Sequence, residues 1–158
     1  MVCKWKTLAR TQKGIAIVEF TIMIPVILLL LYSIAEIGRI QMMSNTLAKT
    51  VRDGARHLAS NAQKGTTGVV DITNLVELQT KNLVVYGIPA PAGTPLLDGF
   101  SVDDVQVNDL GDGLHVSVSA TYNFAPIFSP QIPTFGVMNE PVSLSFPLQA
   151  AVTMLVLK

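Results

Sequence analysis

The side chains with catalytic or metal-binding chemistry are two histidines and a few aspartates. His57 and His115 have no cysteine or carboxylate at the spacing of a metal site. Segment 109–113 contains Asp109 and Asp112 but lacks the alternating oxygen ligands and the distal glutamate of a calcium loop, so it is expected to be a turn. No nucleophile elbow, phosphate-binding glycine loop or pair of catalytic carboxylates is present. The sequence therefore predicts a protein that is not an enzyme and that holds no cofactor and no metal.

The composition excludes further classes of function. Lys+Arg and Asp+Glu both number 11, so no bulk charge indicates a nucleic-acid partner. Hydrophobic residues make up 49% of the chain and charged residues only 14%, which excludes a disordered protein. The single cysteine, Cys3, cannot form a disulfide within the chain. No small-molecule substrate is expected.

One carboxylate has an unusual position, because Glu19 lies inside an apolar run, five residues after Gly14. A carboxylate at membrane depth costs about 2.5–3.5 kcal/mol, so it usually has a partner. A cut after Gly14 would give Ile15 a free α-amine, which could pair with Glu19 of its own or a neighbouring chain. Glu19 would then set the register of subunits in a bundle of helices. The alternative is that its side chain only reaches to the lipid headgroups.

The segment around Glu19 is long enough to cross a lipid bilayer. Residues 15–34 contain Glu19 as their only charged side chain, and a helix of this length spans about 30 Å. Leader residues 1–14 carry four bases and no acid. By the positive-inside bias the leader stays in the cytoplasm and the head lies outside, although four bases also follow the apolar run. We expect a transmembrane helix over residues 15–37, kinked at Pro25.

Three fates of this N-terminal region remain open on the residues alone. It is a permanent single-span anchor that keeps Met1, or a segment cut after Gly14. The third alternative is a cleaved secretory signal with Ser33-Ile34-Ala35 as its cleavage site, so that the mature chain begins at Glu36. The length of the apolar run and its carboxylate argue against the secretory signal.

Several motifs together resemble the TadE-like pseudopilins of the tight-adherence (Flp, type IVc) pilus. The family's prepilin processing pattern is a basic leader ending in glycine, then Glu-Phe, then proline. It is matched by Gly14, Glu19, Phe20 and Pro25. Glu36-Ile37-Gly38-Arg39 resembles the family's E-x-G-R, and Val51-Arg52-Asp53-Gly54-Ala55-Arg56 resembles its A-R-x-G-A-R. The resemblance covers residues 10–59.

The resemblance implies a minor pilin-like subunit that acts by assembly. A prepilin peptidase would cut between Gly14 and Ile15, which also removes Cys3 and leaves a mature chain without a thiol. The implied partners are a sister minor pilin, the major pilin and the inner-membrane pilus assembly platform, besides the lipid bilayer. The N-terminus would be cytoplasmic and the head periplasmic, with incorporation into an extracellular pilus left open.

The residues after the membrane segment predict an amphipathic stem helix over residues 38–62. Apolar residues fall on one helical stripe, with Ser44 and Gly54 at intervening positions. The stripe consists of Ile37, Ile40, Leu47, Val51 and Leu58. The opposite face carries Gln41, Asn45, Lys49, Arg52 and Arg56. We expect the stripe to pack on the chain's own head rather than in a coiled coil.

Residues 63–158 predict an α+β head. A helix over residues 74–86 is indicated by its start signals and by Gly87 as a stop. Apolar and polar residues then alternate through two segments, 116–124 and 142–156, as in antiparallel strands with one buried face. Pro147 predicts a strand break or a sheet edge. The expected fold is a long N-terminal helix packed on a small antiparallel sheet, as in pilins.

The loop between those strands is unusually apolar. Residues 124–136 contain three prolines and the bulky residues Phe124, Ile127, Phe128 and Phe135. Two explanations stay open: a cap folded over the end of the sheet, and a contact surface for another subunit. An exposed aromatic cluster there would instead favour an adhesin-like binding module, which is the main alternative function.

Overall fold

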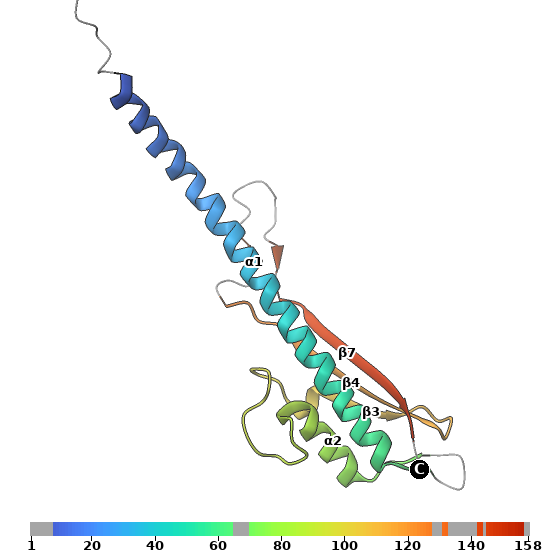
Figure 1. The fold of residues 1–158 in the computed structure, drawn as a ribbon. Coiled ribbons are helices and arrows are strands. Elements are labelled where there is room, and N and C mark those ends of the chain that lie inside the picture. Colours follow the sequence, from blue (N-terminus) through green and yellow to red (C-terminus); the bar gives the residue numbers. More distant parts are fainter. Residues whose placement is uncertain (1–7, 65–69, 128–130, 133–141, 144, 157–158) are drawn as a thin grey trace, which may run out of the picture. The chain divides into compact units, whose positions relative to one another are not determined.

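The computed structural model describes residues 8–64, 70–127, 131–132, 142–143 and 145–156. The chain divides into two compact units, Met1–Arg39 and Ile40–Lys158, which are described separately. Helix α1 (Leu8–Asn61) is the longest element, and its residues belong to both units (Figure 1). Residues 15–35 of α1 are called the apolar segment below, and residues 40–61 the packed segment.

The packed segment buries one face, as its periodicity predicts. Leu47, Val51 and Leu58 are at most 1% exposed, and Ile40 is half-buried against the same core. The predicted opposite face, Gln41, Asn45, Lys49, Arg52 and Arg56, is exposed.

The stripe differs from the prediction at its N-terminal end. Ile37 is 64% exposed, whereas Glu36 is only 3% exposed. The spacing of an ideal helix explains the difference, because each residue turns the helix by about 100°. Glu36 falls about 20° from Leu47 around the helix axis, while Ile37 falls about 80° away. The polar residue therefore occupies the position that the hydrophobic pattern assigned to its neighbour.

Helix α2 (Asn74–Tyr86) has the predicted bounds. Its N-cap is Thr73, whose hydroxyl accepts a hydrogen bond from the Val76 N–H at 3.4 Å. Gly87 ends the helix with φ 77°, a left-handed conformation that favours glycine, and its N–H donates to the Leu83 carbonyl at 3.0 Å.

The main sheet has three antiparallel strands in the order β3-β4-β7 (Figure 1). They are β3 (Val105–Asp109), β4 (His115–Asn123) and β7 (Pro147–Leu155), and the short 3-10 helix η1 (Val102–Asp104) precedes β3. Even-numbered residues of β4 are buried and odd-numbered ones half-buried or exposed, which confirms the predicted alternation. Pro147 begins an edge strand, as expected of a residue without an N–H.

Two smaller ladders accompany the sheet, and neither was predicted as a strand pair. Strand β1 (Gln63–Lys64) pairs with β2 (Val70–Asp71), and β5 (Gln131–Ile132) pairs with β6 (Val142–Ser143), both antiparallel. Because β6 and β7 are separate strands, the alternating run 142–156 is interrupted before Pro147, as predicted.

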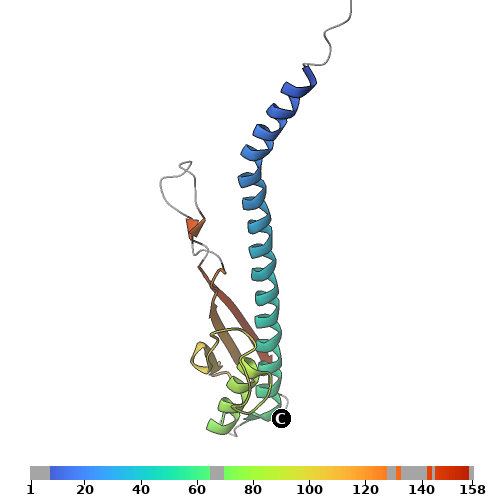
Figure 2. The same cartoon turned by 90° about the vertical axis from the view of Figure 1, so that its left-hand side faces the viewer.

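The core of the second unit lies between a helical layer and the sheet (Figure 2). The packed segment of α1 and helix α2 form one layer, and β3, β4 and β7 form the other. The largest fully buried hydrophobic side chains come from α1, α2, β3 and β4 and from the residues that directly follow β4 and β7: Leu47, Val51, Leu58, Val84, Val85, Val105, Val116, Val118, Phe124 and Val156. The predicted α+β fold, a long N-terminal helix packed on a small antiparallel sheet, is confirmed.

Candidate functional site

The apolar segment of α1 exposes its hydrophobic side chains all around the helix. Ile15, Ile17 and Phe20 are 62–68% exposed, and none of the most apolar 18-residue window is buried inside the structure. The mean hydropathy of that window is 2.6, so the helix is long and apolar enough to cross a membrane. Such a surface requires an apolar environment, either a bilayer or neighbouring helices.

The hydroxyl groups of Thr21 and Ser33 in this segment are satisfied within the helix itself. Thr21 Oγ1 donates to the Ile17 carbonyl and Ser33 Oγ to the Leu29 carbonyl, both at 2.8 Å. These side chains therefore do not need water, which suits a helix in lipid. Glu19 is different, because it is exposed and forms no hydrogen bond or ion pair with any part of the chain that the structure describes.

The other predicted residues of the processing pattern lie on the same helix. Gly14, Glu19 and Phe20 are exposed within α1, and Pro25 lies inside it with helix on both sides. A side chain at Gly14 would meet nothing within 4 Å among the described residues, so close packing against them does not explain that glycine. The cleavage and the kink at Pro25 stay predictions.

The first motif after the apolar segment contains an ion pair across one helical turn. Arg39 Nη1 lies 3.0 Å from Glu36 Oε2, and the Glu36 side chain is only 4% exposed. The arginine compensates a carboxylate that would be costly to bury alone. Gly38 has open space where a side chain would project, so this glycine, like Gly14, is not required by contacts within the described structure.

The second motif is where α1 approaches α2. A Cβ atom added to Gly54 would lie 2.4 Å from Val84 Cγ2, closer than carbon atoms approach, so glycine permits this helix crossing. Val51 and Ala55 are fully buried beside it. Arg52 and Arg56 lie on the exposed face and form no ion pair within the described residues. The motif thus combines a packing face with a basic face.

A polar contact near this crossing was not anticipated from the sequence. Thr80 donates its hydroxyl to the Val76 carbonyl at 2.7 Å, and His57 Nδ1 lies within hydrogen-bond distance of Thr80 Oγ1, at 3.2 Å. Thr80 is fully buried and His57 half-buried. Burial lowers the pKa of His57 below its ordinary value of 6.5. The sequence offers no local signal for a pair 23 residues apart.

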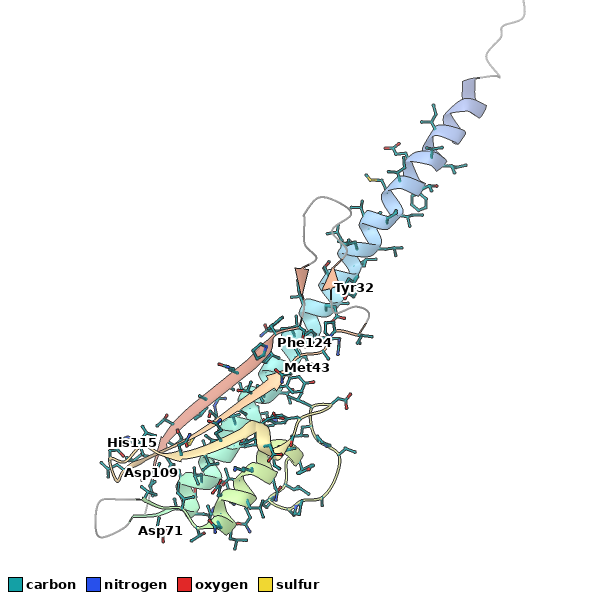
Figure 3. All side chains as sticks on the ribbon, turned by 180° about the vertical axis from the view of Figure 1, so that it is seen from behind. Tyr32, Met43, Asp71, Asp109, His115 and Phe124 are labelled. Atoms are coloured by element: carbon teal, nitrogen blue, oxygen red, sulfur yellow. The ribbon has the colours of Figure 1, made fainter. Side chains whose placement is uncertain are left out.

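The apolar loop is described only in part. Phe124 is 1% exposed, and its ring centroid lies 5.9 Å from that of Phe146, so Phe124 belongs to the core. Ile127 is 62% exposed. Phe128 and Phe135 lie outside the described residues. Figure 3 shows Phe124 at one end of the sheet and His115 with Asp109 at the other.

The aspartate-rich segment forms a turn, as predicted. Asp109 Oδ1 accepts from the Gly111 N–H, and Asp112 Oδ1 accepts from the N–H groups of Leu114 and His115, at 2.8–3.1 Å. Asp112 also bonds the His115 ring through Nδ1, and this bond with the backbone donors lowers the pKa of Asp112 to about 2. Within the described residues, no three His, Cys, Asp or Glu side chains gather as a metal site.

Comparison with known proteins bears on the N-terminal part of the chain. No curated protein and no solved structure matches the chain. Residues 14–56 match a family model described as TadE-like protein. The match begins at the predicted processing glycine and ends with the second motif, so it contains the apolar segment, Glu19 and both motifs.

The matched family consists of structural pilus components, which suggests a pilin-like protein associated with the tight-adherence pilus. Such a protein contacts other pilus components. The apolar helix is consistent with a membrane-associated pilus protein. The match therefore confirms the resemblance drawn from the residues, and it is consistent with a TadE-like protein of the tight-adherence pilus system.

Proposed function

We propose that this chain is a minor pilin-like subunit of a tight-adherence pilus machine, cut after Gly14 by a prepilin peptidase and acting by assembly. One observation carries the proposal. The apolar segment is exposed on all sides and contains a single charged residue, Glu19, five residues after the glycine at which the family match begins. A segment of this kind is suited to enter a bundle of like helices.

The proposed mechanism is electrostatic. Cleavage after Gly14 creates an ammonium group on Ile15, and Glu19 of a neighbouring subunit pairs with it. In a low dielectric this pair is much stronger than in water, and an unpaired carboxylate is expensive. The pairing therefore fixes the axial register between subunits. The mature chain is held in the inner membrane by residues 15–37, with its head in the periplasm.

The charges of the second unit support lateral contacts between subunits. Lys49, Arg52 and Arg56 form an exposed basic face on the packed segment. The exposed Asp103 and Asp112 lie at the edge and the turn of the sheet. Complementary patches of this kind orient partners as they meet. The partners we propose are a sister minor pilin, the major pilin and the assembly platform, besides the peptidase.

Intact mass and N-terminal sequencing of the protein from its native host test the maturation step. A chain that begins at Ile15 supports the proposal. A chain that keeps Met1 would identify a permanent anchor, and one that begins at Glu36 a secreted protein, and either result contradicts the proposed function.

The charge of Glu19 is tested by Glu19→Gln, which keeps the shape of the side chain. Without the carboxylate the amine loses its partner, so we expect expression at the wild-type level but at least about a tenfold loss of surface pili. Piliation is counted by electron microscopy in a strain that carries the variant as its only copy. Thr21→Ala is the matched control, since its hydroxyl bonds only within the helix. Wild-type piliation with Glu19→Gln would contradict the mechanism.

A further inference from the structure

Strand β7 has a free edge, and the phase of its hydrogen bonds shows which groups are exposed there. The Phe124 N–H donates to the Phe146 carbonyl at 3.2 Å and the Val156 N–H to the Leu114 carbonyl at 2.8 Å. In an antiparallel ladder, residues alternately face the partner strand and face away. Even-numbered residues of β7 therefore bond to β4, and odd-numbered residues direct their N–H and C=O groups outward.

The outward row lacks a partner strand within the described residues. It consists of Gln149, Ala151, Thr153 and Leu155, whose side chains are also exposed, and of the carbonyl of Pro147. Four outward N–H donors at the spacing of a β-strand can all be satisfied together by the backbone of another extended chain.

Strand β7 lacks the sequence features by which edge strands usually avoid pairing with another chain. Its nine residues include no Lys, Arg, Asp or Glu and no bulge, and its only proline is the first residue. The opposite edge strand, β3, is different. Strand β3 has only five residues, and three aspartates flank or end it: Asp103, Asp104 and Asp109. The Val105 N–H already donates to the Val102 carbonyl. Of the two edges of this three-stranded sheet, only the β7 edge is uncharged and without a partner strand over its whole length within the described residues.

The two faces of β7 define the side chains of a suitable partner strand. Ala150, Val152 and Met154 point toward the helical layer and are only partly buried, so an apolar row lies beside the open edge. Ala151 and Thr153 lie on the other face. A partner strand that alternates apolar and small polar residues would extend both rows and complete the burial of the apolar one.

The direction of β7 argues against a second copy of the same edge. Figures 1 and 2 show β7 running in the same direction as the packed segment of α1. Two β7 edges paired antiparallel would point the packed segments of the two copies in opposite directions, whereas subunits anchored in one membrane point the same way. Two β7 edges paired parallel about a two-fold axis would place the helical layers on opposite faces of the joined sheet.

We propose that β7 is an interaction surface on which a second, different pilin-like subunit adds an edge strand of alternating apolar and small polar residues. The added strand extends the three-stranded sheet across the two heads. This inference rests on the proposed function, because the requirement for parallel helices comes from a shared membrane. It assigns a defined strand of the head to a contact between subunits.

The test uses the full chain in the native host, with a photo-cross-linking amino acid at Gln149 on β7. The control carries it at Gln106 on β3, which is also an exposed glutamine. We expect a light-dependent adduct from position 149, identified by peptide mass spectrometry as a strand of another pilin-like subunit. We expect about tenfold less adduct from position 106.

Ala151→Pro then removes an outward N–H without removing a bond to β4, and Thr153→Lys places a charge on the edge. Both are expected to reduce the adduct about tenfold while leaving the melting temperature of the chain near that of wild type. Ala151→Val keeps the N–H and should keep the adduct. No adduct from position 149, an adduct with a second copy of this chain, or an adduct insensitive to both edge variants would overturn the inference.

The same strains separate this inference from the proposed function. If the chain matures to Ile15 and its deletion abolishes pili, but position 149 gives no adduct, the β7 contact is wrong and the proposed function stands. If pili persist without the gene, the proposed function is wrong whatever the cross-linking shows.

Discussion

The two segments of α1 have the same secondary structure but opposite relations to their surroundings. In the apolar segment the hydrophobic side chains are exposed, as Leu28 and Leu31 illustrate at 59% each. In the packed segment Leu47 and Leu58 are at most 1% exposed. The difference lies in the pattern of residues, because the apolar segment is hydrophobic on every face and the packed segment on one face only.

This difference indicates that the packed segment of α1 contributes to the stability of the head, whereas the apolar segment serves assembly. The packed segment forms part of a core, so its substitutions should change the unfolding of the head. No residue of the apolar segment is fully buried within the described part of the chain, so its substitutions should act on the membrane or on other subunits. The following predictions test that division.

The largest effect is expected from truncation of a buried leucine. Leu58→Ala removes a fully buried side chain between the helical layer and the sheet, and should lower the free energy of unfolding by about 2–5 kcal/mol. Leu28→Ala, in the apolar segment, is the matched control and should leave it unchanged. Denaturant unfolding of the full chain in detergent, followed by circular dichroism, measures both. Equal losses of unfolding free energy from the two variants would contradict the proposed difference between the packed and apolar segments.

The elements of the second unit were largely predictable because their signals are local. The bounds of α2 follow from residues within one turn of each end, and the buried face of β4 follows from strict alternation. That alternation also places Phe124 in the phase of Tyr122, so its burial was predictable although it was assigned to the candidate interface. The N-cap is Thr73, the residue just before the predicted start of the helix.

The contacts between elements were not predictable from local patterns. Gly54 was identified from a motif, but its partner, Val84, is a residue of a different helix, and so is Thr80, the partner of His57. Ile37 was assigned to the buried stripe because hydrophobicity alone does not indicate that the buried position belongs to Glu36. The processing residues Gly14 and Glu19 stay predictions, because their chemistry involves a peptidase and neighbouring chains.

The next largest effect should come from a methyl group at the helix crossing. Gly54→Ala places a Cβ 2.4 Å from Val84 Cγ2, and Val84 is fully buried with a stiff, β-branched side chain. We expect a net loss of about 1–2 kcal/mol in unfolding free energy, since overpacking outweighs the better helix propensity of alanine. Thermal unfolding of the variant in detergent checks this. A stability equal to wild type would show that the two helices separate freely.

A smaller effect, with the opposite sign, is expected at the other motif glycine. Gly38→Ala adds a methyl group into open space, so helix propensity alone should stabilise α1 by about 0.5–1 kcal/mol. The same unfolding measurement tests the sign. If Gly38→Ala keeps a stable head but abolishes piliation, the glycine provides close approach to another subunit, which would sharpen the division between the two segments. A destabilised head would instead contradict the open space around Gly38.

The smallest effect concerns pH and the packed segment alone. Burial lowers the pKa of His57, so between that lowered value and the ordinary value of 6.5 the unfolded chain binds more protons than the folded chain. Its contribution to stability is therefore full above pH 6.5 and is lost as the pH falls through the lowered pKa. Because the ring is only half-buried, the loss should be modest. His57→Gln should remove this part of the pH dependence, and the difference between variant and wild type over pH 5–7 isolates it. Identical pH profiles would show that burial does not lower the pKa of His57.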